Sequence, residues 1–468
     1  MEETLKLLFD KYDNFKNQKI DSNRITHATL VQEIKKISGK DLLKVNSAGQ
    51  SINGSNIFKI SIGKGETKIL AWSQMHGDEP TATASIFDLL NFFISNDEFN
   101  KFRNDLLDKL ELIFIPMLNP DGAKLYSRYN SINIDINRDA LRKESPESRI
   151  LWKLAEEIKP EFGFNLHDQN SYYTAGISDR SAAISLLAPP INYEKTINET
   201  RKKSMQVISV IEKTLSRFIP GNIARYDDDF EPRAFGDNLT KYGISSILIE
   251  SGFIKNDQDK DFIRKLNFIS LLSAFHTISD RTFTKVPVDD YFNIPENKSM
   301  LFDLLLRNLT SHFNGKEFKI DIGINREKKY DPDKNYFYFK GTIQEVGDLS
   351  LNHGIEEYNL TRYQVETTQI SDKIISTQSE LNNLDYSKLH RDGFGIIRIN
   401  NELLGNSYLQ YPICAIPYYT NYLQSISKNE CPNLIIKKNN VIEYIIINGF
   451  IITLDDAKKK IKNGLVIS

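Results

Sequence analysis

Strand-like apolar runs alternate with amphipathic segments through the first 285 residues of the chain. Residues 69–72 (Ile-Leu-Ala-Trp), 112–115 (Leu-Ile-Phe-Ile), 162–166 (Phe-Gly-Phe-Asn-Leu) and 247–249 (Ile-Leu-Ile) have the composition of strands that are covered on both faces. Helical periodicity predicts helices at residues 146–158, 194–218 and 258–280. This alternation predicts an α/β fold with a mixed, mostly parallel sheet flanked by helices.

The pattern changes near Val286-Pro287-Val288. Apart from a helix expected at about residues 298–312, short strands dominate the rest of the chain, at residues 318–324, 336–343, 395–399, 434–436 and 441–447. The Lys-Lys-Asn-Asn sequence at residues 437–440 favours a hairpin turn between the last two. We therefore predict two domains. Residues 1–285 begin with a polar helical segment of about 45 residues, and residues 286–468 form a β-rich accessory domain.

Two potential metal ligands stand three residues apart where the run at residues 69–72 gives way to a helical segment. His76 and Glu79 precede Pro80, which suits the first turn of a helix. A histidine nitrogen and a carboxylate are both zinc ligands, and catalytic zinc normally takes three ligands from protein. The pair therefore predicts part of a metal site at the carboxyl end of a strand, where open α/β sheets place their sites.

Polar residues come after the other apolar runs as well. Residues 112–115 lead to an Asn-Pro-Asp-Gly turn at residues 119–122. His167 and Glu250 directly follow the third and fourth runs. If the four strands are parallel neighbours joined through helices, these groups converge on one edge of the sheet.

The order of these motifs resembles that of a known enzyme family. Along the chain they are His76-Gly-Asp-Glu79, Asn119-Pro-Asp-Gly122, Asn137-Arg138, His167 and Glu250. Over roughly residues 25 to 285 the chain resembles the zinc carboxypeptidases of the carboxypeptidase A superfamily. That family's fold is a mixed sheet of the kind predicted above, so a carboxypeptidase-like domain is expected.

The resemblance also implies a role for each motif residue. By this resemblance, His76, Glu79 and His167 would bind a zinc ion and Glu250 would be the general base. Arg128 would polarise the scissile carbonyl, and Asn137 and Arg138 would hold the terminal carboxylate. The resemblance further implies that Asp135 orients the first histidine. Asp168 is expected to make local hydrogen bonds and not to bind metal.

Some positions depart from the digestive enzymes of the family. Asp78 stands where those enzymes carry an arginine, and their mobile tyrosine has two candidate matches, Tyr226 and Tyr242. The specificity pocket is expected at residues 225–233, where the acidic residues would favour a basic substrate side chain and Arg233 an acidic one. The charge preference therefore stays open. A solvated acidic loop explains this segment equally well.

Composition narrows the range of partners. The chain of 468 residues is 40% hydrophobic and has a net charge of −2, so nucleic acid is not an expected partner. A membrane is not expected as a partner either, because long apolar runs are lacking. Cys414 and Cys431 lie outside the catalytic region and are expected to be free thiols. The first residues lack a secretory signal pattern, and no run approaches about 20 apolar residues. A cytoplasmic location is expected, and the oligomeric state is left open.

Three functions are compatible with these motifs. The first is a metallocarboxypeptidase acting on peptide substrates with a free carboxylate, which Asn137 and Arg138 favour because an endopeptidase has no terminal carboxylate to bind. The second is a zinc amidase or deacylase acting on cell-wall peptides or N-acyl amino acids. The third is a binding module that kept the scaffold. The presence of Glu250 with all three ligands argues against the third, since binding alone needs no general base.

Overall fold

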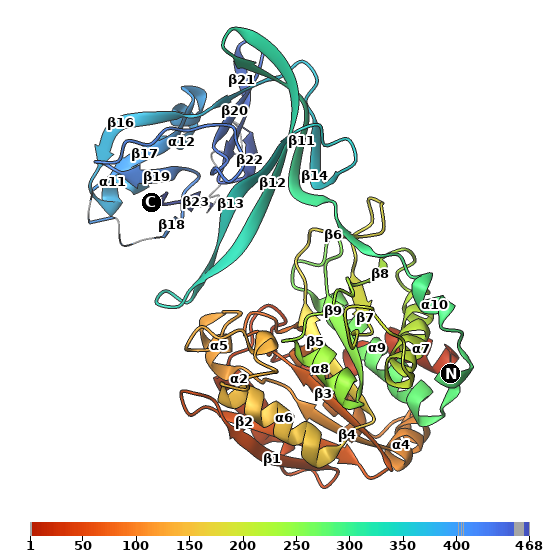
Figure 1. Cartoon of the computed structure of the whole chain (residues 1–468). Helices are drawn as coiled ribbons and strands as arrows, with labels where there is room; N and C mark the ends of the chain where they lie inside the picture. Colours follow the sequence, from red (N-terminus) through yellow and green to blue (C-terminus); the bar gives the residue numbers. More distant parts are fainter. Residues whose placement is uncertain (1, 401, 404, 406, 454–462, 468) are drawn as a thin grey trace. The chain divides into compact units, whose positions relative to one another are not determined.

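The computed structural model describes residues 2–400, 402–403, 405, 407–453 and 463–467 (Figure 1). The chain divides into two compact units, residues 1–299 and 300–468. The sequence pattern changes earlier, at residue 286. The intervening residues lie with the first unit because strand β10 (Asn297–Ser299) pairs with β6 (Tyr173–Ala175).

A single sheet forms the centre of the first unit, with strand order β1-β2-β4-β3-β5-β9-β7-β8. The middle strands β4, β3, β5 and β9 are mutually parallel, whereas β1, β2 and β7 run antiparallel to their neighbours in β2, β4 and β9. The bounds are β1 Leu43–Gln50, β2 Asn56–Gly63, β3 Thr67–Ser73, β4 Leu110–Ile115, β5 Phe162–Asp168, β7 Ile184–Leu187, β8 Ile223–Arg225 and β9 Ser245–Ser251. The predicted mixed, mostly parallel α/β sheet is therefore confirmed.

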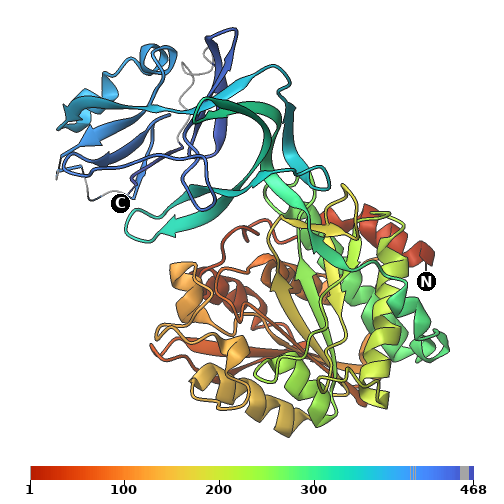
Figure 2. The same ribbon diagram turned by 45° about the horizontal axis from the view of Figure 1, so that its top comes forward.

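Helices cover both faces of this sheet (Figures 1 and 2). Successive residues of β3 enter different cores: Ala71 packs in the larger cluster with α3, α7 and α9, and Leu70 and Trp72 pack in the smaller one with α6 and α8. This division explains why the central strands are apolar at nearly every position. The bounds are α3 Thr81–Ile94, α4 Asn100–Lys109, α5 Pro120–Leu125, η2 Ile136–Arg138, α6 Pro146–Ile158, α7 Glu199–Leu215, α8 Phe235–Tyr242, α9 Asp261–Ser279, η3 Thr282–Lys285 and α10 Asp289–Phe292.

Helix α6 has the bounds that the sequence predicted, and the residues at its two ends explain why. Helix α6 begins at Pro146 after Ser145, whose hydroxyl accepts a hydrogen bond from the Ser148 amide. It ends at Ile158 and is followed by Lys159 in the left-handed conformation. The other two predicted helices are confirmed with shorter bounds, as α7 and α9.

The N-terminal segment is held on the rest of the first unit by the arginine of a buried ion pair. It contains α1 (Glu2–Asp10), η1 (Tyr12–Asn14) and α2 (His27–Ile37). Arg264 of α9 pairs with Asp88 of α3, and both side chains are fully buried. The same guanidinium donates to the backbone oxygens of Ile20 and Asn17 at 2.9 and 3.0 Å. The expected helical segment therefore packs on the sheet domain.

One expectation from the sequence was wrong, and one strand was not predicted. Strand β1 was missed because its polar sequence buries only Leu43 fully. Residues near 298–312 form strand β11 (Leu301–Phe313) and not a helix. The leucine-rich sequence of β11 has helical propensity, but its pairing with β12 and β14 decides the structure.

The second unit is built mainly of strands, as predicted. Its main sheet has the order β13-β12-β11-β15-β20-β21-β22, with β14 paired to β11 outside this path. The predicted hairpin lies between β20 and β21, where Asn439 and Asn440 both adopt the positive φ that this turn requires. The bounds are β12 Lys316–Asp331, β13 Tyr336–Gly347, β14 His353–Asn359, β15 Gln364–Thr367, β16 Gln369–Ile375, α11 Gln378–Asn382, α12 Tyr386–Arg391, β17 Phe394–Ile399, β18 Tyr408–Leu409, β19 Cys414–Pro417, β20 Leu434–Lys438, β21 Val441–Ile447, β22 Phe450–Thr453 and β23 Gly464–Leu465.

The two cysteines of the chain both lie in the second unit. Cys414 and Cys431 are free thiols, as expected. Within the described parts of the chain, no helix combines the length and the apolar character needed to cross a bilayer.

Candidate active site

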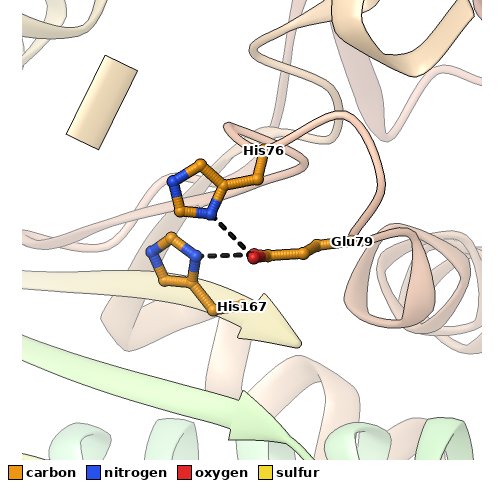
Figure 3. A group of neighbouring side chains, drawn as sticks. All are labelled: His76, Glu79 and His167. Carbon is orange, nitrogen blue, oxygen red and sulfur yellow. Dashed lines mark hydrogen bonds and ion pairs between the residues drawn. The ribbon is translucent and has the colours of Figure 1, made fainter. Parts of the chain in front are cut away.

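Three potential metal ligands meet at the carboxyl ends of β3 and β5 (Figure 3). His76 lies in the turn after β3, Glu79 lies just before α3, and His167 is the penultimate residue of β5. The Nδ1 atoms of His76 and His167 are each 2.7 Å from a different oxygen of the Glu79 carboxylate. Their ligand atoms lie within 4.8 Å of one another, close enough to hold one metal ion.

The turn that carries His76 is fixed by the Asn-Pro-Asp-Gly turn beside it. Gly77 packs so closely on this turn that a Cβ atom would lie 2.0 Å from the carbonyl carbon of Gly122. The Asn119 side chain donates to the Met75 carbonyl at 3.2 Å, and its oxygen accepts from the Gly122 amide at 2.8 Å, capping α5. The motif at residues 119–122 therefore acts structurally, by holding the backbone on either side of the first histidine.

The second nitrogen of His76 is held by Asp135. The Nε2 atom lies 3.2 Å from Asp135 Oδ1, and Arg128 Nε donates to Asp135 Oδ2 at 3.0 Å. Arg128 Nη1 also lies 3.2 Å from His76 Nδ1 and 3.7 Å from Glu79 Oε1. A carboxylate on the outer nitrogen of a histidine fixes the ring angle and leaves the inner nitrogen facing the metal. The arrangement of Asp135 agrees with the orienting role that the sequence resemblance implied.

The Glu79 carboxylate carries the negative charge of the cluster. Burial would raise the pKa of Glu79, but His76 and His167 hold it well below its usual range. Burial would lower the pKa of His76, but the Glu79 charge and the Asp135 hydrogen bond outweigh it and raise the pKa to about 9. For His167 burial dominates and lowers the pKa. A cation at the centre of the cluster would supply the positive charge that the Glu79 carboxylate attracts.

Glu250 lies beside the cluster on the neighbouring strand. It is directly opposite His167 in the parallel pairing of β5 with β9. The side chain is buried, and its Oε2 atom has no hydrogen-bond partner. Burial and the nearby Glu79 charge raise the pKa of Glu250 well above its usual range. A carboxyl group with raised pKa next to a metal site is suited to accept and release protons.

The site opens into a cavity of about 480 Å³. The cavity is lined by all seven residues that the sequence assigned to the site: His76, Glu79, Arg128, Asn137, Arg138, His167 and Glu250. Within it, the Asn137 side-chain oxygen accepts from the Phe235 amide at 3.0 Å, which ties this segment to the start of α8. Arg138 Nε lies 3.3 Å from Glu231 Oε2. The structure thus brings together groups that are up to 174 residues apart in the chain.

The structure also gives the positions of Asp168 and of the two candidate tyrosines. Asp168 accepts hydrogen bonds from Thr81 Oγ1 at 2.5 Å and from Lys260 Nζ at 3.1 Å, which agrees with the expected local role. Tyr226 lines the cavity, whereas Tyr242 is half exposed and packs on Trp152.

Several residues of the cavity were not predicted from the sequence, among them two with titratable side chains. Tyr173 and Asp237 line the cavity, on strand β6 and helix α8. Neither belongs to a motif, so no signal in the sequence marked them. Only the folding of β6 and α8 around the cavity brings them to the site.

The donor set fits zinc. Two imidazole nitrogens and one carboxylate are the protein ligands of a catalytic zinc site that keeps an open position. Both imidazoles present the same ring atom, Nδ1, towards Glu79, and the outer nitrogen of His76 is occupied by Asp135. Close by, Glu250 carries an unpartnered buried oxygen, which is costly unless a polar or charged group compensates it.

Comparison with known proteins agrees with this site. Residues 30–182 match the family model described as zinc carboxypeptidase. Carboxypeptidase 2 of Trichophyton rubrum is 32% identical over 111 residues, which cover 23% of this chain and 19% of that protein. Carboxypeptidase SOL1 of Arabidopsis thaliana is 26% identical over 140 residues, covering 26% and 28% of the two chains. Among solved structures, a metallo-carboxypeptidase from Burkholderia cenocepacia has a TM-score of 0.43 at 16% identity, covering 56% of this chain and 70% of that one.

The match to a family covers about a third of the chain. Residues 30–182 are similar to the zinc carboxypeptidase family, which confirms the resemblance seen in the sequence. The matched segment contains the His76 to Glu79 motif and His167 but ends before Glu250. The chain spans about a fifth of the length of the first curated relatives that it matches.

Proposed function

We propose that the first unit is a zinc-dependent metallocarboxypeptidase that hydrolyses the C-terminal peptide bond of peptides. The observation that carries this proposal is the convergence, in one cavity, of a metal-ligand triad, a buried carboxyl group and an arginine. The triad is formed by His76, Glu79 and His167. Zinc held by such ligands lowers the pKa of water towards about 7 and polarises a carbonyl oxygen.

The residues around the triad divide the remaining work. Glu250 takes a proton from the attacking water and delivers it to the leaving amine nitrogen as the C–N bond breaks, a role typically worth about 10² to 10⁴ in rate. Arg128 donates hydrogen bonds to the scissile carbonyl oxygen, where negative charge develops. Asp135 holds both Arg128 and His76 in place.

The substrate end of the cavity is assigned to Arg138 and Asn137. A guanidinium binds a carboxylate through parallel charge-assisted hydrogen bonds, which suits the free C-terminus of a peptide. Asn137 lies next to it and fixes the start of α8. A substrate without a terminal carboxylate would leave Arg138 without this partner, which makes the site selective for chain ends.

Metal analysis of the full chain is the first test. We expect about one zinc per chain. His76→Ala or His167→Ala should lose this zinc, and Cys414 and Cys431 should remain free thiols in both variants. Mass spectrometry of intact protein under native conditions would give the ratio. A protein that is fully active after exhaustive chelation would refute the zinc requirement.

A substrate panel tests the reaction itself. Peptides with a free C-terminus, the same peptides with an amidated C-terminus, and N-acyl amino acids should be compared by following release of the C-terminal product. We expect only the free-acid peptides to be cleaved efficiently. Preferential hydrolysis of N-acyl amino acids would instead favour the deacylase function.

A further inference from the structure

Lys260 lies where the strand ends that carry His167 and Glu250 come together. Directly before α9, its Nζ atom lies 3.1 Å from Asp168 Oδ2 and 3.4 Å from the carbonyl oxygen of Ser251. Asp168 follows His167 at the end of β5, and Ser251 follows Glu250 at the end of β9. One ammonium group therefore connects the strand end that carries a metal ligand with the strand end that carries the buried carboxyl group.

Asp168 extends this contact to a third element, helix α3. Its Oδ2 atom accepts a hydrogen bond from the hydroxyl of Thr81, the first residue of α3, at 2.5 Å. Its backbone amide donates to Glu79 Oε2 at 3.3 Å. Asp168 therefore contacts the Glu79 carboxylate and also the start of the helix that Glu79 precedes by two residues. Together, Lys260 and Asp168 contact each of the three elements that position the site.

The ion pair between Lys260 and Asp168 is shielded from water. The exposed fractions of the two side chains are 26% and 8%. Asp168 Oδ1 is buried and has no hydrogen-bond partner among the described residues, so the carboxylate depends on the contacts of Oδ2. In the same part of the chain, Lys260 is its only ion-pair partner. Removing one member of a shielded pair leaves the other charge poorly solvated, which costs much more than breaking a pair at the surface.

The backbone of Lys260 is held in a conformation that residues other than glycine seldom adopt. Its φ is 54° and its ψ is 21°, in the left-handed region. Such a conformation persists only where the surrounding contacts compensate for its cost. The contacts of the ammonium group with Asp168 and Ser251 are of this kind. The Ser251 carbonyl also accepts from the Gln169 amide at 3.0 Å, which joins the ends of β5 and β9 at the same point.

The opposite side of the triad has the same arrangement of a carboxylate and a cation. There, Asp135 Oδ1 contacts the outer nitrogen of His76, and Arg128 holds Asp135. On this side, Asp168 contacts another of the three ligands through its amide, and Lys260 holds Asp168. Groups that hold metal ligands in place typically contribute about 10- to 100-fold to metal affinity or activity.

We propose that Lys260 is a positioning residue of the metal site. Through Asp168 it holds Glu79 and the end of β5 in the geometry that binds the metal, and through Ser251 it holds the end of β9 beside them. Lys260 lies outside the lining of the cavity, so it acts through these residues and not on the substrate. This inference rests on zinc binding by the triad, which is one part of the proposed function, and does not depend on the identity of the substrate.

The test measures the zinc affinity of the folded full chain, which a purely structural role of Lys260 would leave unchanged. For Lys260→Met we expect the dissociation constant for zinc, from competition with a chelator, to rise by about 10- to 100-fold. Lys260→Arg keeps the charge and should recover most of the affinity. Lys203→Met is a matched control, because Lys203 is half-exposed and its partner Glu161 keeps Arg281 as a second cation. The control should change the zinc dissociation constant by less than about twofold.

A double variant tests whether the loss arises at Asp168. When Asp168→Asn is combined with Lys260→Met, the amide oxygen still accepts from Thr81, and no carboxylate is left without a cation. We expect the double variant to bind zinc more tightly than Lys260→Met alone, because the two substitutions act on one interaction. Circular dichroism of each variant confirms that it is folded. If Lys260→Met does not fold, Lys260→Gln, which still donates a hydrogen bond to Asp168, takes its place.

The outcomes separate this inference from the proposed function. An unchanged zinc dissociation constant in the folded Lys260 variant, or a double variant that binds no more tightly than the single one, would overturn the inference and leave the carboxypeptidase function standing. Zinc binding that depends on Lys260 in a chain that cleaves no peptide would support the inference and refute the function. A wild-type chain that binds no zinc would overturn both.

Discussion

Replacing Arg138 with alanine should selectively weaken the use of a free C-terminus. The guanidinium lines the cavity, and 37% of its side chain is exposed, so the substrate carboxylate would be only partly shielded from water. A charge-assisted pair of this kind is worth about 1.5–3 kcal/mol, which corresponds to a loss of about 10- to 150-fold in kcat/KM. The exposure of the side chain favours the lower half of this range.

The fold should survive this substitution. Removing Arg138 leaves Glu231 bound by both donors of Arg233, so no buried charge is left alone. Arg142→Ala is a matched control, because it removes the same charge at an exposed position outside the cavity. We expect Arg142→Ala to leave kcat/KM within about twofold of the wild type.

A double-mutant cycle makes this test specific. The four rates come from wild type and Arg138→Ala, each acting on a free-acid peptide and on its C-terminal amide. Amidation should cost wild type about as much as the substitution does, and should cost the variant little more, because both changes remove one interaction. If wild type cleaves the amide as fast as the acid, Arg138 does not bind the terminal carboxylate. Additive losses would mean that the substitution acts elsewhere.

Three further outcomes are expected. Glu250→Gln should keep its zinc and lower kcat by at least about 10²-fold in steady-state assays, and an unchanged kcat would assign the base elsewhere. Arg264→Met should lower the free energy of unfolding of the first unit by about 3–5 kcal/mol in denaturant titrations, because it leaves the fully buried Asp88 without its cation. As a control, Lys101→Met removes a lysine from an exposed ion pair and should change this free energy by less than about 0.5 kcal/mol. Because the pKa of Asp237 is about 7 when folded and near 3.8 when unfolded, its contribution to stability is lost as the pH rises from about 4 to 7. Asp237→Asn should therefore be more stable than wild type above pH 7, by at most about 4 kcal/mol, and equal unfolding midpoints at pH 8 would contradict the shift.

Some of the fold and site could be predicted because it depends on residues close together in sequence. The apolar runs around Trp72 and Phe164 predicted buried parallel strands, since strands covered on both faces are apolar at successive positions. His167 directly follows one of these runs and His76 follows the other by four residues, so their place at the sheet edge followed from the strands. Strand β11 was assigned to a helix because its leucines fit both periods, and only pairing with distant strands decided between them.

Tertiary structure decided how the cavity is charged. In the sequence, Glu231, Arg233 and Asp237 are simply neighbours in a charged segment, and either sign could have faced a substrate. In the folded chain, Arg233 lies outside the cavity and is bound to Glu231, while the first turn of α8 buries Asp237 in the cavity wall. The sequence by itself predicted the candidate metal ligands and the four central strands that carry the site. Which charges meet solvent, substrate or one another depends on side-chain burial and pairing, and these are properties of the packed structure alone.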